Sequence, residues 1–114
     1  MTVRVLILED DVWAVTPAGR IDVAAARALE DAINGLLDQG HGRVVVDLSE
    51  TIYISSGGLR VLFLALRRAR TFGGDLHLAA MGDNVREIFR VAGFDALFAI
   101  HPSAAEAAQS LRAA

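Results

Sequence analysis

The chain contains no cysteine, two prolines, few aromatic residues and no long apolar run among its 114 residues. Without cysteine it can form no disulfide, thiol nucleophile or thiolate metal site, which suits a reducing compartment. The longest nearly unbroken apolar run, residues 61–66, falls far short of the ~20 residues that a membrane-spanning helix needs. Residues 1–4 lack the features of a signal peptide. We therefore predict a soluble cytoplasmic protein that does not insert into a membrane.

The charge and size of the chain exclude further classes. The net charge of -3 gives no basic surface for nucleic acid, and one tryptophan and one tyrosine are too few for a base-stacking platform. Apolar residues make up 54% of the chain, which is enough for a packed core and too much for a disordered chain. The length fits one domain, residues 1–114.

Hydrophobic periodicity predicts strands that alternate with helices along the chain. The strands are expected at residues 3–8, 12–16, 43–48, 75–80 and 97–100, and the helices at residues 23–37, 59–72, 85–92 and from 103 onward. This order, ββαβαβαβα, predicts an α/β fold with helices packed on a mixed sheet. Most strands would be parallel, with one antiparallel strand from the N-terminal hairpin.

Individual residues indicate where the predicted strands and helices begin and end. Pro17 donates no ladder hydrogen bond, so we expect it where the sheet no longer needs one. Residues 19–22 are predicted as a loop in which Asp22 caps the first helix. Asn84 followed by Glu87 resembles a capping box for the third helix.

The most informative segment is the connection between the strand at 43–48 and the next helix. Ligands and modifications gather at the carboxyl ends of strands in open α/β sheets, and Ser55 and Ser56 stand there beside two glycines. A helix N-terminus would stabilise a phosphate on a serine, because its amide groups are unpaired. On the residues alone, a plain connector with a capping serine is the favoured interpretation, because serine and glycine are common at helix starts.

Residues 53–59, Tyr-Ile-Ser-Ser-Gly-Gly-Leu, resemble the signature of the STAS family, specifically the bacterial anti-sigma factor antagonists. That signature has an aromatic residue, an aliphatic residue and Asp-Ser-(Ser/Thr)-Gly-Leu before a helix. Residues 19–22 (GRID), 73–76 (GGDL) and 85–94 (VREIFRVAGF) are also similar to the family and follow in the same order. The resemblance covers nearly the whole chain and implies the STAS fold.

The resemblance also implies a partner and a modification. In this family a partner that is both anti-sigma factor and serine protein kinase phosphorylates the serine after the motif aspartate. The unphosphorylated antagonist binds this partner and frees the sigma factor. The matching residue is Ser56, while Ser55 replaces the aspartate and Gly57 replaces the second Ser/Thr. Other STAS domains have no phosphorylation cycle and serve as scaffolds or as subunits of transporters or signalling complexes, so this alternative stays open.

The helix after this motif suggests a docking surface. Val61 and Leu64 fall off the apolar stripe that its other large residues form, so they either flank Ser56 in a docking surface or pack on a neighbouring helix. Asp22 would contact the partner in addition to capping its helix. The predicted partner-binding residues are Asp22, Ser55, Ser56, Gly57, Gly58, Arg60, Val61 and Leu64. For Arg60, a solvated basic strip is the alternative.

The sequence does not suggest an enzyme. His41, His77 and His101 lie in separate predicted elements without metal-ligand spacing, so we expect no metal site. The chain lacks the glycine-rich motifs of nucleotide-binding loops and the serine elbow of hydrolases. We predict a regulatory domain without a catalytic residue, a cofactor or a small-molecule ligand.

Overall fold

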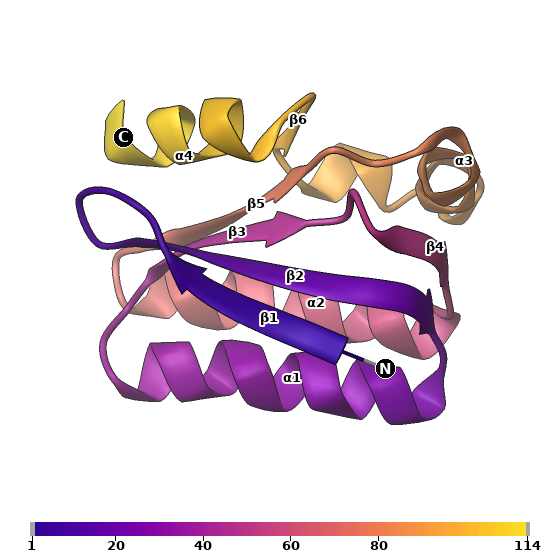
Figure 1. Ribbon diagram of the computed structural model, residues 1–114, viewed down its shortest axis with the longest axis horizontal. Coiled ribbons are helices and arrows are strands. Elements are labelled where there is room, and N and C mark those ends of the chain that lie inside the picture. The colour runs from indigo at the N-terminus through magenta and orange to yellow at the C-terminus, as the bar shows by residue number, and fades with distance from the viewer. Residues whose placement is uncertain (1, 114) are drawn as a thin grey trace.

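The computed structural model describes residues 2–113, which form six strands and four helices (Figure 1). The elements are β1 (Thr2–Ile7), β2 (Val12–Ile21), α1 (Val23–Asp38), β3 (Arg43–Asp47), β4 (Thr51–Ile54), α2 (Ser56–Thr71), β5 (Asp75–Ala79), α3 (Asp83–Ala92), β6 (Ile100–His101) and α4 (Ala104–Ala113), with a 3-10 turn at Asp95–Leu97. None of the helices within residues 2–113 is both long and apolar enough to cross a membrane.

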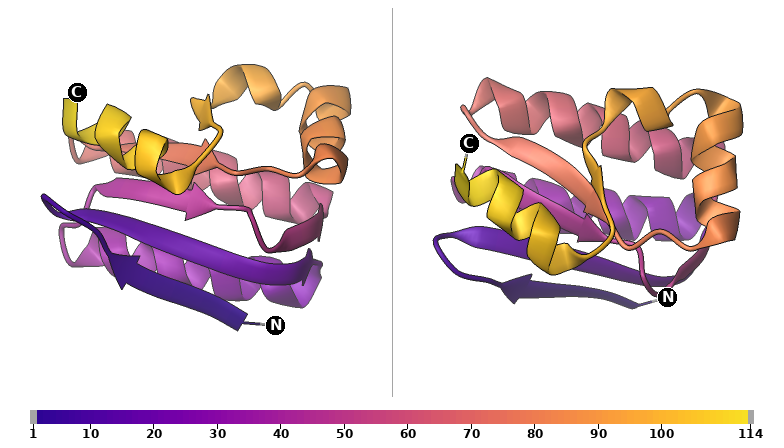
Figure 2. Two further views of the ribbon diagram at one scale, coloured as in Figure 1. Left: turned by 45° about the horizontal axis from the view of Figure 1, so that its top comes forward. Right: turned by 90° about the horizontal axis from the view of Figure 1, so that it is seen from above.

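The sheet has the order β1-β2-β3-β5-β6, and β4 pairs with β2 beyond the end of β3. The β1–β2 pair is antiparallel and the other pairs are parallel. Helices α1 and α2 cover one face of the sheet, α4 covers the other, and α3 lies beside β4 (Figures 1 and 2). The predicted fold class, a mostly parallel α/β sheet with one antiparallel hairpin strand, is confirmed.

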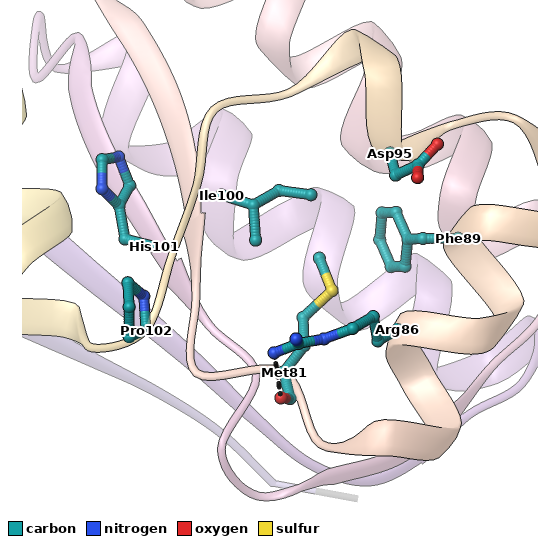
Figure 3. Close-up of a pocket in the computed structure, with 7 residues that line it drawn as sticks. All are labelled: Met81, Arg86, Phe89, Asp95, Ile100, His101 and Pro102. Carbon is teal, nitrogen blue, oxygen red and sulfur yellow. Dashed lines mark hydrogen bonds between the residues drawn. The ribbon is translucent and has the colours of Figure 1, made fainter.

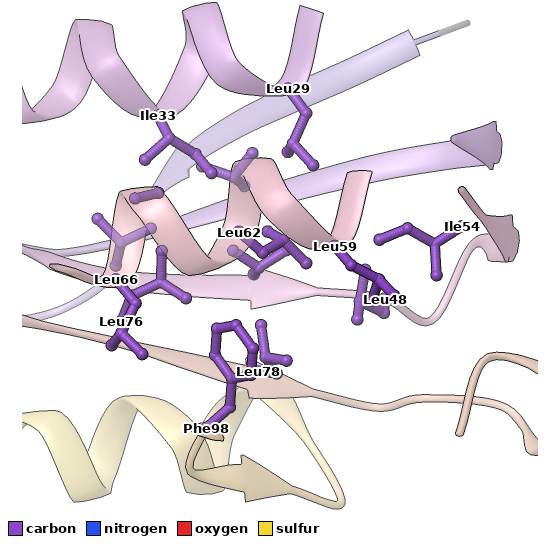
Figure 4. Packing of buried hydrophobic residues seen from close by; sticks show 14 of the residues in the cluster. Leu29, Ile33, Leu48, Ile54, Leu59, Leu62, Leu66, Leu76, Leu78 and Phe98 are labelled. Atoms are coloured by element: carbon purple, nitrogen blue, oxygen red, sulfur yellow. The ribbon is translucent and has the colours of Figure 1, made fainter. Parts of the chain in front are cut away.

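The main core lies between the sheet and the α1–α2 layer (Figure 4). Leu29 and Ile33 of α1 meet Leu62 and Leu66 of α2 above the strands, and all four side chains are buried. A smaller apolar cluster lies beneath α4 on the opposite face. Strand β3 is buried on both faces, as its continuous run of β-branched residues predicts.

The structure corrects the predicted end of β2. The strand continues to Ile21, so the predicted loop at 19–22 is wrong. Pro17 lies between the stretch of β2 that pairs with β3 and the stretch that pairs with β4, so its missing donor costs little there. Its carbonyl accepts a hydrogen bond from Thr51 Oγ1 at 2.9 Å. The predicted cap is confirmed, because the Ala25 amide donates to Asp22 Oδ1 at 3.0 Å.

Strand β4 was absent from the predicted order, which becomes ββαββαβαβα. It has only four residues inside a polar connection, and its pairing with a distant part of β2 specifies it rather than local propensity. Helix α2 also begins earlier than predicted, at Ser56 rather than Leu59. Both corrections matter for function, because they place the serine motif at a strand-to-helix junction.

The predicted capping box of α3 is wrong, and the reason is a tertiary contact. Gly82 occupies the cap position without a side-chain hydrogen bond, while Glu87 is bonded to Arg90. Asn84 Nδ2 instead donates to the Ile52 carbonyl of β4 at 2.8 Å. This bond ties the start of α3 to β4, next to the motif. The predicted last strand is likewise shorter and later, at Ile100–His101.

Candidate functional site

Two helix starts lie side by side where β2 and β4 end. The Ser55 amide donates to the Ile21 carbonyl at 2.9 Å, which places Ser55 next to Asp22. Asp22 is the N-cap of α1, and Ser55 is the N-cap of α2 through the Gly58 amide, which donates to Ser55 Oγ at 3.2 Å. The two caps therefore bring Asp22 and the serine motif together at one end of the α1–α2 layer.

The two adjacent serines differ in what their hydroxyls do. Ser55 is half-buried and its oxygen is occupied as a cap. Ser56 is the first residue of α2 and is exposed, and its hydroxyl has no hydrogen-bond partner among residues 2–113. The first turn of a helix carries unpaired amides and the positive end of its dipole. Ser56 is therefore the accessible hydroxyl, in a place that favours a negative charge.

An apolar groove of about 430 Å³ opens beside Ser56, between α2 and α3. Its lining consists of Tyr53, Ile54, Ser56, Leu59, Glu87, Ile88, Val91 and Ala92. Val91 is 72% exposed, which is high for a large aliphatic side chain. Ser56 and Glu87 are its polar lining residues apart from the Tyr53 hydroxyl. The arrangement suits an apolar segment of a partner protein, with Ser56 within its footprint.

Two arginines contact residues that line this groove. The Arg90 guanidinium donates to Glu87 Oε2 at 3.0 Å, and this hydrogen bond lowers the pKa of the Glu87 carboxyl. On the strand side, the Arg20 guanidinium lies 4.3 Å from the centre of the Tyr53 ring, within cation–π range. Glu87 is therefore ionised at neutral pH and its charge is balanced by Arg90, so a phosphate on Ser56 would add net negative charge to this groove.

Gly58 has a packing role. It is buried, and a Cβ built on it would lie 2.7 Å from Ile54 Cγ1 and 2.9 Å from Ile21 Cγ2. The missing side chain lets α2 approach both strands closely. The prediction that Gly58 belongs to an exposed partner-binding surface is therefore corrected. Its neighbour Gly57, by contrast, is exposed.

Val61 and Leu64 lie on the other side of α2 from the groove. They line a shallow hollow with Glu30 and Asn34 of α1. Val61 is half-buried against the core, in agreement with the packing alternative, and Leu64 remains 43% exposed. These residues do not flank Ser56. Arg60 is exposed one turn after Ser56 and has no ion-pair partner among the described residues.

The α3 side of the groove was not foreseen from the sequence. Ile88 and Ala92 share an apolar helical face with Val85 and Phe89, but nothing local indicates that this face meets the serine motif. Val91 offers a signal, since it is a large aliphatic residue outside that face. The position of Val91 on the groove follows only from the packing of α3 beside β4. That packing includes the hydrogen bond from Asn84 to the Ile52 carbonyl.

A second pocket, of about 280 Å³, lies on the other side of α3 (Figure 3). Its lining consists of Met81, Arg86, Phe89, Asp95, Ile100, His101 and Pro102. The dashed line in Figure 3 marks the contact of 3.5 Å from Arg86 Nη2 to the Met81 carbonyl, which is long for a hydrogen bond. Helix α3 therefore separates two hollows, and only the groove contains a residue of the serine motif.

The capping role of Ser55 gives a testable prediction. Ser55→Ala removes the acceptor for the Gly58 amide and should lower the free energy of unfolding by about 1 kcal/mol. Ser56→Ala is the matched control and should leave stability nearly unchanged, because the Ser56 hydroxyl is exposed and unbonded. Urea unfolding followed by circular dichroism measures both values. An equal loss in the two variants would contradict this assignment of the cap.

Comparison with known proteins agrees with this geometry. The family model described as "Mlab, STAS domain" matches residues 8–100. BtrV of Bordetella bronchiseptica, named as a candidate anti-sigma factor antagonist, is 38% identical over 96 residues, which cover 84% of this chain and 83% of BtrV.

Solved structures show the same fold. An anti-sigma factor antagonist from Mycobacterium paratuberculosis superposes with a TM-score of 0.87 at 28% identity, covering 97% of this chain and 93% of that one. The anti-sigma factor antagonist SpoIIAA, in its unphosphorylated form, superposes with a TM-score of 0.76 at 15% identity, covering 99% of this chain and all of SpoIIAA, and its phosphorylated form gives the same score. The chain belongs to the STAS domain family, as a domain of the anti-sigma factor antagonist type.

Proposed function

We propose that this chain acts in the cytoplasm as a phosphorylation-controlled anti-sigma factor antagonist. Its unmodified form binds an anti-sigma factor that is also a serine kinase, and a phosphate on Ser56 ends this binding. The observation that carries the proposal is the position of Ser56, exposed at the first residue of α2 and on the lining of an apolar groove.

The groove supplies the binding energy in this proposal. An apolar segment of the partner would cover Ile88 and Val91, and burial of apolar surface contributes roughly 25 cal/mol per Å². The two charges on α3, Glu87 and Arg90, would lie at the rim and contribute mainly to orientation. Asp22 and Arg60, both exposed near the motif, are candidates for polar contacts around this centre.

Phosphoryl transfer needs a free hydroxyl. The Ser56 oxygen would attack the γ-phosphorus of ATP, the bond to the β-phosphate oxygen would break, and ADP would leave. The hydroxyl proton would pass to a base of the kinase. Ser55 is the poorer acceptor, because its oxygen holds the Gly58 amide and its side chain is half-buried. The replacement of the motif aspartate by Ser55 therefore keeps the cap and leaves Ser56 available.

In this proposal the phosphate weakens the contact between the groove and the partner. Phosphoserine brings about -1.5 to -2 charges at pH 7, on a groove that already contains the Glu87 carboxylate. An apolar partner segment would then have to bury or approach uncompensated charge, which is unfavourable. The helix N-terminus stabilises the same phosphate, so the domain itself stays folded.

Incubation with the cognate kinase and ATP, followed by mass spectrometry of peptides, tests the proposal. We expect one phosphate, on Ser56, in the unmodified protein and in Ser55→Ala, and none in Ser56→Ala. A phosphate on Ser55 would contradict the assignment of the acceptor. Binding to the kinase without any phosphate gain would favour the alternative, a STAS scaffold or subunit without a phosphorylation cycle.

A further inference from the structure

The outer edge of β1 is a surface that the switch does not use. Strand β1 ends the sheet, and its only strand neighbour among residues 2–113 is β2. Every residue of β1 except Val3 is exposed, including Val5 at 43%, Leu6 at 61% and Ile7 at 55%. An edge of this kind presents a row of unpaired amide and carbonyl groups between apolar side chains.

This edge lacks the usual protection against another strand. Residues 2–7 contain no proline, lysine or acidic residue, and their pairing with β2 has no bulge. The single charge of the strand belongs to Arg4, which is held in a two-pronged ion pair by Glu50. The chemistry of the edge therefore fits a β-strand that adds through main-chain hydrogen bonds.

The alternation of side chains along β1 favours a second copy of this chain as the added strand. Val3, Val5 and Ile7 lie on the face of the sheet that α1 covers, since Val5 and Ile7 pair with Val15 and Trp13 of that face. In an antiparallel pair of strands, directly opposed side chains lie on the same face of the sheet. When a two-fold axis perpendicular to the sheet relates the two strands, one residue must therefore lie opposite its own copy, with the axis midway between the two. An axis at Arg4 would oppose two arginines.

An axis at Val5 avoids this conflict. It sets Val3 opposite Ile7 of the second copy and Val5 opposite Val5, which gives a continuous apolar row on the α1 face. On the other face, Arg4 lies opposite Leu6, and each arginine keeps Glu50 as its partner. We propose that the chain forms a symmetric dimer in which two β1 strands pair antiparallel around Val5 and join two sheets into one.

Helix α1 offers room and matched charge for this dimer. Glu30 and Asn34 face α2, so helical geometry puts Ala28, Ala32 and Gly35 on the opposite flank, above β1. These small residues allow the α1 helix of the second copy to come close, and a Cβ built on Gly35 meets nothing within 4 Å.

The charges nearest this flank occur in balanced pairs. Arg27 and Asp31 lie one turn apart on α1 with 3.9 Å between Arg27 Nε and Asp31 Oδ1. Arg4 and Glu50 form a second pair of opposite charges beside the strand, and the acidic turn at residues 9–11 lies beyond its end. Two copies can therefore meet along residues 3–7 without opposing like charges there.

The molar mass in solution, from light scattering or sedimentation, tests the dimer directly. We expect the unmodified chain to have twice its monomer mass at micromolar concentration, and Val5→Lys to raise the dimer dissociation constant by about tenfold or more, because two lysines would meet at the axis. Ile52→Lys, at an apolar β4 residue that is 59% exposed, is the matched control and should remain dimeric. A monomeric unmodified chain, or an unaffected Val5→Lys dimer, would overturn the proposal.

The absence of cysteine allows a second test that does not depend on affinity. Val5→Cys should form a disulfide between copies on mild oxidation, because opposed residues of paired strands have Cα atoms within disulfide range. Leu6→Cys should cross-link much more slowly, since Leu6 would face Arg4 of the second copy. Equal cross-linking at both positions, or faster cross-linking at Leu6, would contradict an axis at Val5. Neither outcome bears on Ser56, since no residue of β1 lines its groove.

Discussion

Ser56→Asp is expected to weaken binding of the anti-sigma partner by roughly 30-fold or more, or about 2 kcal/mol. The substitution puts a permanent carboxylate on the lining of the apolar groove, where it joins that of Glu87. The fold should not change, because an acidic residue in the first turn of a helix interacts favourably with the helix dipole. Isothermal titration calorimetry with the purified partner measures the loss, and circular dichroism checks the fold.

Ser56→Ala is the matched control for this effect. It adds no charge to the groove and removes the acceptor, so partner binding should stay close to that of the unmodified protein even with ATP present. Val91→Ala complements it, because removing apolar surface from the groove should weaken binding without any change in charge. Equal affinity of Ser56→Asp and the unmodified protein would rule out switching by charge.

Gly58→Ala is expected to lower the free energy of unfolding by about 1–3 kcal/mol, the usual cost of overpacking. The new methyl group would lie 2.7 Å from Ile54 Cγ1 and 2.9 Å from Ile21 Cγ2. Both contacted atoms belong to stiff, β-branched side chains that are almost fully buried, so they cannot easily move aside. Urea unfolding gives the change in stability.

The neighbouring glycine provides the control. A Cβ on Gly57 would meet only Ser55 Oγ, at 3.8 Å, so Gly57→Ala should be neutral or stabilising by up to about 1 kcal/mol through helix propensity. Opposite signs for these two adjacent substitutions would support close packing of α2 on the strands. A stabilising Gly58→Ala would show that α2 has room to move away from β2 and β4.

The parts of the fold that were predictable from the sequence carry their signal locally. The spacing of Leu29, Ile33 and Leu36 specifies α1, and the run of valines in β3 specifies a strand buried on both faces. Strand β4 and the second half of β2 could not be predicted in this way. They are specified by pairing with each other across about thirty residues of chain, and Pro17 and Gly19 argued locally against a continuing strand.

The residues of the candidate site likewise fall into those predictable from local patterns and those placed by tertiary contacts. Ser56 and Asp22 were accessible to sequence reasoning, because caps and the serine motif are local patterns. The α3 side of the groove was not, because it depends on a tertiary contact from Asn84 to the backbone of Ile52. Sequence reasoning also could not separate the exposed Gly57 from the buried Gly58, which differ only in the side of α2 on which they lie.

The separate roles of Ser55 and Ser56 have a consequence for the rate of the proposed switch. Because Ser55, and not Ser56, caps α2, a phosphate on Ser56 would leave this cap in place. The phosphate could then be added or removed while the start of the helix stays folded, so no slow refolding step would delay the response.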